Sequence, residues 1–161
     1  MEDPTGRYPW ATGNGEAFVA AYRYFVDHCR QWSHGRFFFV WSPKGLRQMK
    51  DYFPGPNYVD YVGVSLYGLE RWDIGHFGKP RDFNETFGET YRSASQFKKP
   101  IMIAEFGVQG GASYRDLWFS ELARAKDSFP LLRMAVYFNA QEPWSWPDGY
   151  GKPDWRIDSA D

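Results

Sequence analysis

Glu105 is the residue around which chemistry can be built in this sequence. It follows the apolar run at 101–104 and precedes Phe106 and Gly107. Such a run, opened by a proline, predicts a strand that is buried on both faces and ends at the carboxylate. A buried, unpaired charge is costly, and catalytic residues collect at the carboxyl ends of parallel strands. We therefore predict that Glu105 lies at a cleft and acts in catalysis; the alternative is a loop cap or a partner for an arginine.

Aromatic residues make up 20% of the chain, with 8 Trp, 11 Tyr and 14 Phe. Several tryptophans stand beside Pro, Gly, Ser or Asp in loop-like contexts: Trp10, Trp41, Trp72, Trp144, Trp146 and Trp155. Flat apolar rings with a polar tip are suited to stacking on flat ligands. The C–H faces of sugars are such ligands, and nucleic-acid bases are disfavoured by the balanced charge of the chain.

The composition excludes several classes of protein. The 161 residues suit one domain spanning 1–161, and 19 Lys and Arg offset 20 Asp and Glu. The chain has no basic stripe of the kind that binds nucleic acid, and it has no apolar run long enough to span a membrane. The start of the chain does not resemble a signal peptide, and the single Cys29 excludes an internal disulfide. No metal-ligand spacing or phosphate-binding loop is present, so we expect no metal and no cofactor.

Elements of two kinds alternate along the chain and must position Glu105. Hydrophobic periodicity predicts helices at 16–32, 84–97 and 113–126, with a short helix at 46–52. Apolar runs predict strands at 36–41, 59–67, 99–107 and 132–139, with long irregular segments at 69–83 and 140–161. Alternation of this kind is typical of parallel strands with helical crossovers, and therefore of an α/β fold.

The ends of the predicted helices and strands carry further signals. Asn14 is placed to cap the first helix, and Ser113 with Asp116 resembles a capping box. One face of the first helix is predicted to be core: Phe18, Tyr22, Phe25, Val26 and Cys29. Polar or aromatic residues stand at the strand ends: Trp41, Tyr67, Glu105 and Asn139. Because parallel strands end at one edge, we expect these four residues at the same rim.

Six motifs in register resemble one family. They are Tyr8-Pro9-Trp10, Val40-Trp41-Ser42-Pro43, Tyr52-Phe53-Pro54-Gly55 with the strand at 59–64, the stretch at 99–107, Tyr137-Phe138-Asn139, and the stretch at 154–158. In this order they resemble the second half of a clan A glycoside hydrolase, closest to family 26, which contains β-mannanases and endoglucanases. The resemblance covers nearly the whole chain.

The resemblance implies a fold and a site. It implies the C-terminal half of a (β/α)8 TIM barrel, whose four strands would be the fifth to eighth. It implies a retaining enzyme acting on a β-linked polysaccharide such as mannan or β-glucan, with Glu105 as nucleophile and Tyr67 orienting it. The expected substrate-binding residues are Trp10, Trp41, His76, Asn139, Trp144 and Trp146. The resemblance also suggests that the protein is secreted or periplasmic.

The acid/base of the resemblance has two possible positions. Counting back from Tyr8 without gaps places it on Glu2; with a two-residue insertion, Met1 matches the motif and the acid/base lies upstream. A β/α barrel needs about 250 residues, so we expect either a truncated product or open edges that pair with another copy in a homo-oligomer. The alternatives to an enzyme are a carbohydrate-binding remnant and a functionally silent structural half-barrel.

Overall fold

The computed structural model describes residues 13–32, 35–43 and 49–157. The elements follow in the order α1 (Gly15–Trp32), β1 (Val40–Trp41), the 3-10 helix η1 (Met49–Tyr52), β2 (Tyr61–Leu69), α2 (Glu70–Phe77), α3 (Phe83–Ser95), β3 (Ile101–Gln109), α4 (Ala112–Ser128) and β4 (Leu132–Tyr137). The described strands form one 4-stranded sheet in the order β1-β2-β3-β4, and every pairing is parallel. The predicted α/β class, with parallel strands joined by helical crossovers, is confirmed.

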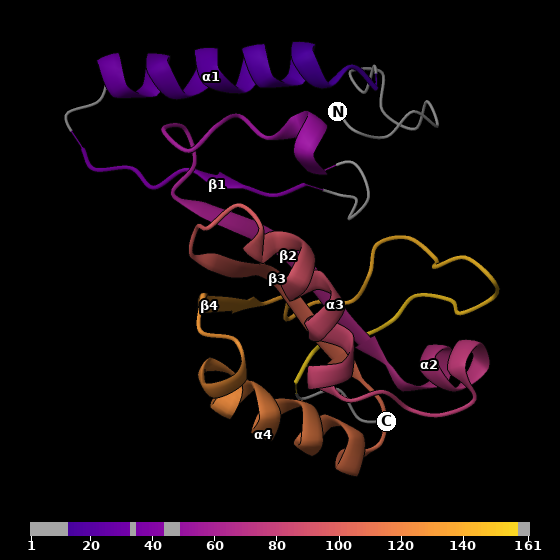
Figure 1. Cartoon of the computed structure of the whole chain (residues 1–161). Helices are drawn as coiled ribbons and strands as arrows, with labels where there is room; N and C mark the ends of the chain where they lie inside the picture. Colours follow the sequence, from indigo (N-terminus) through magenta and orange to yellow (C-terminus); the bar gives the residue numbers. More distant parts are fainter. Residues whose placement is uncertain (1–12, 33–34, 44–48, 158–161) are drawn as a thin grey trace.

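The core lies between the sheet and two helices. Figure 1 shows α3 and α4 lying along the sheet, with α1 beside the β1 edge. Phe106 of β3 stacks on Trp118 of α4 with ring centroids 6.0 Å apart, and Phe83 of α3 meets Trp118 edge to face at 5.9 Å. Burying a side chain of this size contributes about 1.5–3 kcal/mol. These aromatic contacts hold the helices against the strand that carries Glu105.

The first strand is shorter than the sequence predicts. Only Val40 and Trp41 form β1, whereas the prediction began at residue 36. The Asp60 side chain, rather than a strand, accepts the Phe39 N–H at 2.7 Å. Because β2 begins only at Tyr61, the residues before Val40 have no ladder to join on that side. Phe37 and Phe38 are 55% and 69% exposed, so the predicted burial is wrong for these two residues, whereas Phe39 is buried.

The segment predicted to be irregular at 69–83 contains the helix α2. Its own periodicity is weak, and tertiary contacts hold it in place. Asp73 is 1% exposed and accepts hydrogen bonds from Arg81 Nε at 2.9 Å and from the Tyr114 hydroxyl at 2.7 Å. Gly78 ends the helix in the left-handed conformation (φ 73), and its N–H bonds the Ile74 carbonyl. The buried hydrogen bonds of Asp73 therefore stabilise a helix that the local sequence pattern does not predict.

The helix caps confirm one expectation and correct another. Asn14 Oδ1 accepts the Ala17 N–H at 3.0 Å, as predicted. The predicted Ser113 capping box is wrong: the N-cap of α4 is Gly111, whose N–H donates to Glu70 Oε2 at 2.7 Å. A capping box is instead present at α3, where Asp82 and Glu85 bond each other's backbone N–H.

The predicted core face of α1 is only partly buried. Phe25 of the predicted core face is 59% exposed, whereas Val26 beside it is fully buried. Phe25 therefore lies on the flank of α1 rather than in the core.

No helix in the described part of the chain is long and apolar enough to cross a membrane.

Candidate functional site

A β-bulge sets the direction of Glu105. Val64 of β2 is level with Ile103 of β3, but Ser65 is level with Glu105, so the pairing skips Ala104. The extra residue turns the Glu105 side chain to the exposed side, while the next residue, Phe106, is buried. Glu105 thus lies within β3, which continues to Gln109, and not at the end of the strand as predicted.

Two hydroxyl groups hold the Glu105 carboxylate. Ser65 Oγ and the Tyr67 hydroxyl both donate to Glu105 Oε2, each at 3.2 Å. Among the described residues, none donates to Oε1. Burial first, and then the negative charges of Glu105 and Glu142, raise the pKa of Tyr67 well above its usual value. The phenol therefore stays protonated and acts as a donor, and the predicted proximity of Tyr67 and Glu105 is confirmed.

Tyr67 is supported by two tryptophans from the tail, the segment of residues 138–157 that follows β4. Its ring centroid lies 4.8 Å from that of Trp155 and 6.0 Å from that of Trp146, which it meets edge to face. Trp155 is fully buried. Trp146 is one of the predicted substrate-binding residues, but Trp155 is not. The sequence signal that could have identified Trp155 as a site residue is its position in the motif at 154–158.

The tail is tied to the sheet at its base. The Tyr137 hydroxyl donates to the Trp155 carbonyl at 2.7 Å, and Gln141 forms an antiparallel bridge with Asp154. Asn139 Oδ1 accepts the Ile157 N–H at 2.9 Å. The amide oxygen of Asn139, a predicted substrate-binding residue, is therefore engaged with the tail in this structure.

The far end of the tail lies against α2. In Figure 1 the tail runs as a long yellow loop beside α2 before it returns to the sheet. His76 stacks on Trp72 with ring centroids 4.2 Å apart, and the Tyr150 ring lies 5.8 Å from that of His76. Arg71 donates to the Tyr150 carbonyl. The predicted substrate-binding residue His76 thus belongs to an aromatic cluster that links α2 to the tail.

A pocket of about 330 Å³ begins beside the two donors to Glu105. Its lining residues are Ser65, Leu66, Tyr67, Leu69, Trp72, Arg81, Thr86, Glu89, Thr90 and Trp146. The lining combines indole rings with hydroxyl and charged groups, and its size falls within the range of ligand sites in proteins. Stacking surfaces next to hydrogen-bonding groups are the chemistry that a sugar ring requires.

Other predicted site residues lie elsewhere. Trp41 is 1% exposed and packs against Phe53 and Phe97, with ring centroids 5.2 and 4.9 Å away. It pairs with Val62, near the start of β2, so its predicted place at the rim with Glu105 is wrong. Core packing occupies its ring, and we assign it no sugar contact.

The remaining predicted residues divide into two groups. Trp144 is 71% exposed in the tail, where its ring is open to solvent. Glu2 and Trp10 lie outside the described residues.

No group of three or more His, Cys, Asp or Glu that could hold a metal ion occurs within the part of the chain that the structure describes.

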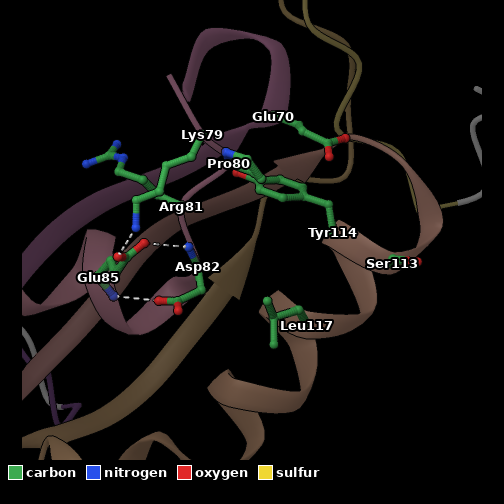
Figure 2. A pocket seen from close by; sticks show the side chains of 9 residues that line it. All are labelled: Glu70, Lys79, Pro80, Arg81, Asp82, Glu85, Ser113, Tyr114 and Leu117. Carbon is green, nitrogen blue, oxygen red and sulfur yellow. Dashed lines mark hydrogen bonds and ion pairs between the residues drawn. The ribbon is translucent and has the colours of Figure 1, made fainter. Parts of the chain in front are cut away.

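A second pocket, of about 350 Å³, lies between the start of α3 and the first turns of α4. Figure 2 shows that Lys79 pairs with Glu85, which in turn forms hydrogen bonds with Asp82. Of the other charged lining residues, Arg81 pairs with Asp73, and Glu70 accepts the Gly111 N–H. The lining residues include neither Glu105 nor its two donors. We assign this pocket no ligand.

The fold and the site define a class of protein. The parallel α/β sheet presents a hydroxyl-bonded carboxylate, Glu105, whose two donors Ser65 and Tyr67 line an aromatic pocket. A model of the family described as glycosyl hydrolase family 26 matches residues 2–127, and the chain belongs to that family.

Known proteins are similar to the chain in sequence or in fold. The chain is 27% identical over 170 residues to Endoglucanase H of Acetivibrio thermocellus, a match that covers 95% of the chain and 17% of that protein. The catalytic domain of the endo-β-1,4-mannanase from Bacillus sp. JAMB-750 is similar in fold, with a TM-score of 0.56 and 18% identity over 89% of this chain and 38% of that one. A double mutant of the Cellulomonas fimi endo-β-1,4-mannanase gives a TM-score of 0.54 and 22% identity over 79% and 30%. The chain therefore spans well under half the length of these relatives.

Proposed function

We propose that the chain carries the nucleophile of a retaining glycosidase that cleaves a β-linked polysaccharide internally, such as mannan or β-glucan. The observation that supports this most directly is the Glu105 carboxylate, exposed at a bulge with Oε2 held by Ser65 and Tyr67. The relatives named as endo-β-1,4-mannanases and as an endoglucanase suggest the substrate class.

The geometry suits a double displacement. Oε1 of Glu105 attacks the anomeric carbon, and the glycosidic oxygen leaves with its bonding electrons and takes a proton from the acid/base. Water, deprotonated by the same acid/base, then displaces Glu105 and restores the carboxylate. The two carboxyl groups of such a pair lie roughly 5–5.5 Å apart. For the acid/base two positions stay open as proposals: a residue upstream of Met1, or Glu2.

The substrate would bind along the aromatic residues of the tail and α2. Trp146 and Trp72 both line the pocket that begins at Tyr67, and His76 stacks on Trp72. Trp144 offers an exposed ring farther along the tail. We propose Trp144, Trp146, His76, Asn139 and Trp10 as sugar contacts.

Covalent trapping tests the role of Glu105 without requiring an acid/base. A 2-deoxy-2-fluoro glycosyl fluoride of mannose or glucose should react with Oε1 of Glu105, forming the glycosyl ester and releasing fluoride. Mass spectrometry of the peptides should locate the added sugar on Glu105. A sugar on another carboxylate, or no adduct with either reagent, would contradict the assignment.

Hydrolysis of soluble mannan and β-glucan supplies the second measurement. Glu105→Gln preserves the shape of the side chain and removes its charge, so turnover should fall to below about a thousandth while folding is retained. Glu16→Gln, on the exposed first turn of α1, is the matched control and should leave turnover unchanged. Turnover in Glu105→Gln equal to that of an active unmodified chain would show that Glu105 is not the nucleophile.

A second candidate function is carbohydrate binding without turnover. It is favoured by the exposed ring of Trp144 and by the aromatic pocket at Tyr67. In affinity electrophoresis, a binding module would be retarded by mannan or β-glucan, release no sugar, and lose retardation in Trp144→Ala. If the chain shows no turnover and is not retarded by either polysaccharide, a purely structural role is the remaining candidate.

A further inference from the structure

Trp155 lies directly against Tyr67 although it comes from the irregular tail. The side chain of Trp155 is fully buried, and its ring centroid is 4.8 Å from that of Tyr67. This approach depends on Gly107 of β3, where an added Cβ would lie 2.9 Å from an atom of each ring. The position of Trp155 therefore limits where the Tyr67 ring can lie.

Glu142 holds the polar edge of Trp155. The indole Nε1–H donates to Glu142 Oε1 at 3.0 Å. Glu142 is itself fixed, because its backbone N–H donates to the Pro153 carbonyl at 2.8 Å. A buried indole N–H without an acceptor is destabilising, so the carboxylate selects one orientation of the ring.

We propose that Glu142 is a positioning residue of the Glu105 site. By accepting the indole hydrogen bond, it holds Trp155 against Tyr67 and so keeps the Tyr67 hydroxyl within reach of Glu105. This inference rests on the proposed function, in which Tyr67 orients the nucleophile. The charge of Glu142 also contributes to the raised pKa of Tyr67, which keeps the phenol a donor. Glu142 acts through two aromatic rings and is not itself a catalytic residue.

Two neutral variants separate the hydrogen bond from the charge. Glu142→Gln removes the charge but retains an oxygen that can accept from the indole, whereas Glu142→Ala removes both. Gln141→Ala, at the neighbouring exposed position, is the matched control. The NMR signals to follow are the Trp155 indole N–H and the Tyr67 ring, each identified by its loss in Trp155→Phe or Tyr67→Phe.

The expected result is a shift of both sets of signals in Glu142→Ala, and small shifts in Glu142→Gln and Gln141→Ala. A merely structural role of Glu142 would move the indole signal of Trp155 and leave the Tyr67 ring signals in place. That outcome, or an unchanged indole signal in Glu142→Ala, would overturn the proposal.

Trapping of Glu105 with the fluoro sugar gives the functional readout. The labelling rate should fall about tenfold in Glu142→Ala and change less than about twofold in Glu142→Gln, because small displacements of a positioning group slow the reaction strongly. Equal rates in all variants would overturn the positioning role. Absence of labelling in the unmodified chain would count against the proposed function, while the shifts of the Tyr67 signals would still support the link from Glu142 to Tyr67.

Discussion

Gly107 shows how a single residue shapes the candidate site. It is buried in β3, two residues beyond Glu105. The nearest atoms to an added Cβ belong to Trp155 and Tyr67, both at 2.9 Å, a separation that real Cβ atoms do not tolerate. Glycine is therefore required here for the close approach of two rings, and the site depends on that approach.

Gly107→Ala should destabilise the protein by about 1–3 kcal/mol, because the methyl group must displace Trp155 or Tyr67 from a packed position. Urea unfolding measures the change. Gly88→Ala in α3 is the matched control: an added Cβ there meets nothing within 4 Å. That substitution should stabilise the helix by about 0.5–1 kcal/mol. Similar effects of both substitutions would contradict the packing argument.

At the scale of elements, α2 and α3 are joined by a segment that polar contacts hold in place. Arg81 pairs with the buried Asp73, and the next residue, Asp82, caps α3. Glu85 is the other member of the capping box. Its pKa lies below the usual value, mainly because Lys79 donates a hydrogen bond to its carboxylate. These contacts determine where α3 begins and so how it lies on the sheet.

Asp82→Ala should cost about 1 kcal/mol of unfolding free energy, since it leaves the Glu85 N–H without its acceptor. Chemical denaturation followed by circular dichroism provides the measurement. Ser113→Ala is the control, because the structure assigns the N-cap of α4 to Gly111. A change within about 0.5 kcal/mol is expected there. A larger loss in Ser113→Ala than in Asp82→Ala would reverse the assignment of the caps.

The whole molecule presents apolar side chains at both edges of its sheet. In the described chain β1 and β4 each pair on one side only. Phe38 beside β1 is 69% exposed, and Met134 and Val136 on β4 are 47% and 44% exposed. Open strand edges next to apolar side chains favour pairing with another chain. We propose that two copies associate through these edges.

Sedimentation at micromolar concentration tests this association. A pair of copies should sediment at twice 18.8 kDa, and Val136→Lys, which places a charge on the β4 edge, should shift the population toward single chains. Leu117→Lys adds a similar charge on α4, away from the edges, and should leave the population unchanged. A single species of 18.8 kDa that unfolds cooperatively would rule out the proposed pairing.

The sequence by itself determined the parallel α/β sheet and the nearness of Glu105 to Tyr67. Both follow from local patterns: apolar runs mark buried strands, amphipathic spacing marks helices, and alternation of the two forces the strands to be parallel. Residues at corresponding positions of neighbouring parallel strands then lie close together, as Tyr67 of β2 and Glu105 of β3 do. These features need no knowledge of which distant side chains touch.

Only the tertiary structure decided how the site is built. The bulge at Ala104 depends on the register between β2 and β3, which no local pattern of β3 specifies. The place of Trp155 depends on the space beside Gly107, and α2 depends on Asp73 meeting Tyr114 of a distant helix. Trp41 is a core residue because its ring packs against Phe97, which is distant in the sequence. Contacts between distant residues decided each of these features, and periodicity within one segment carries no information about such contacts.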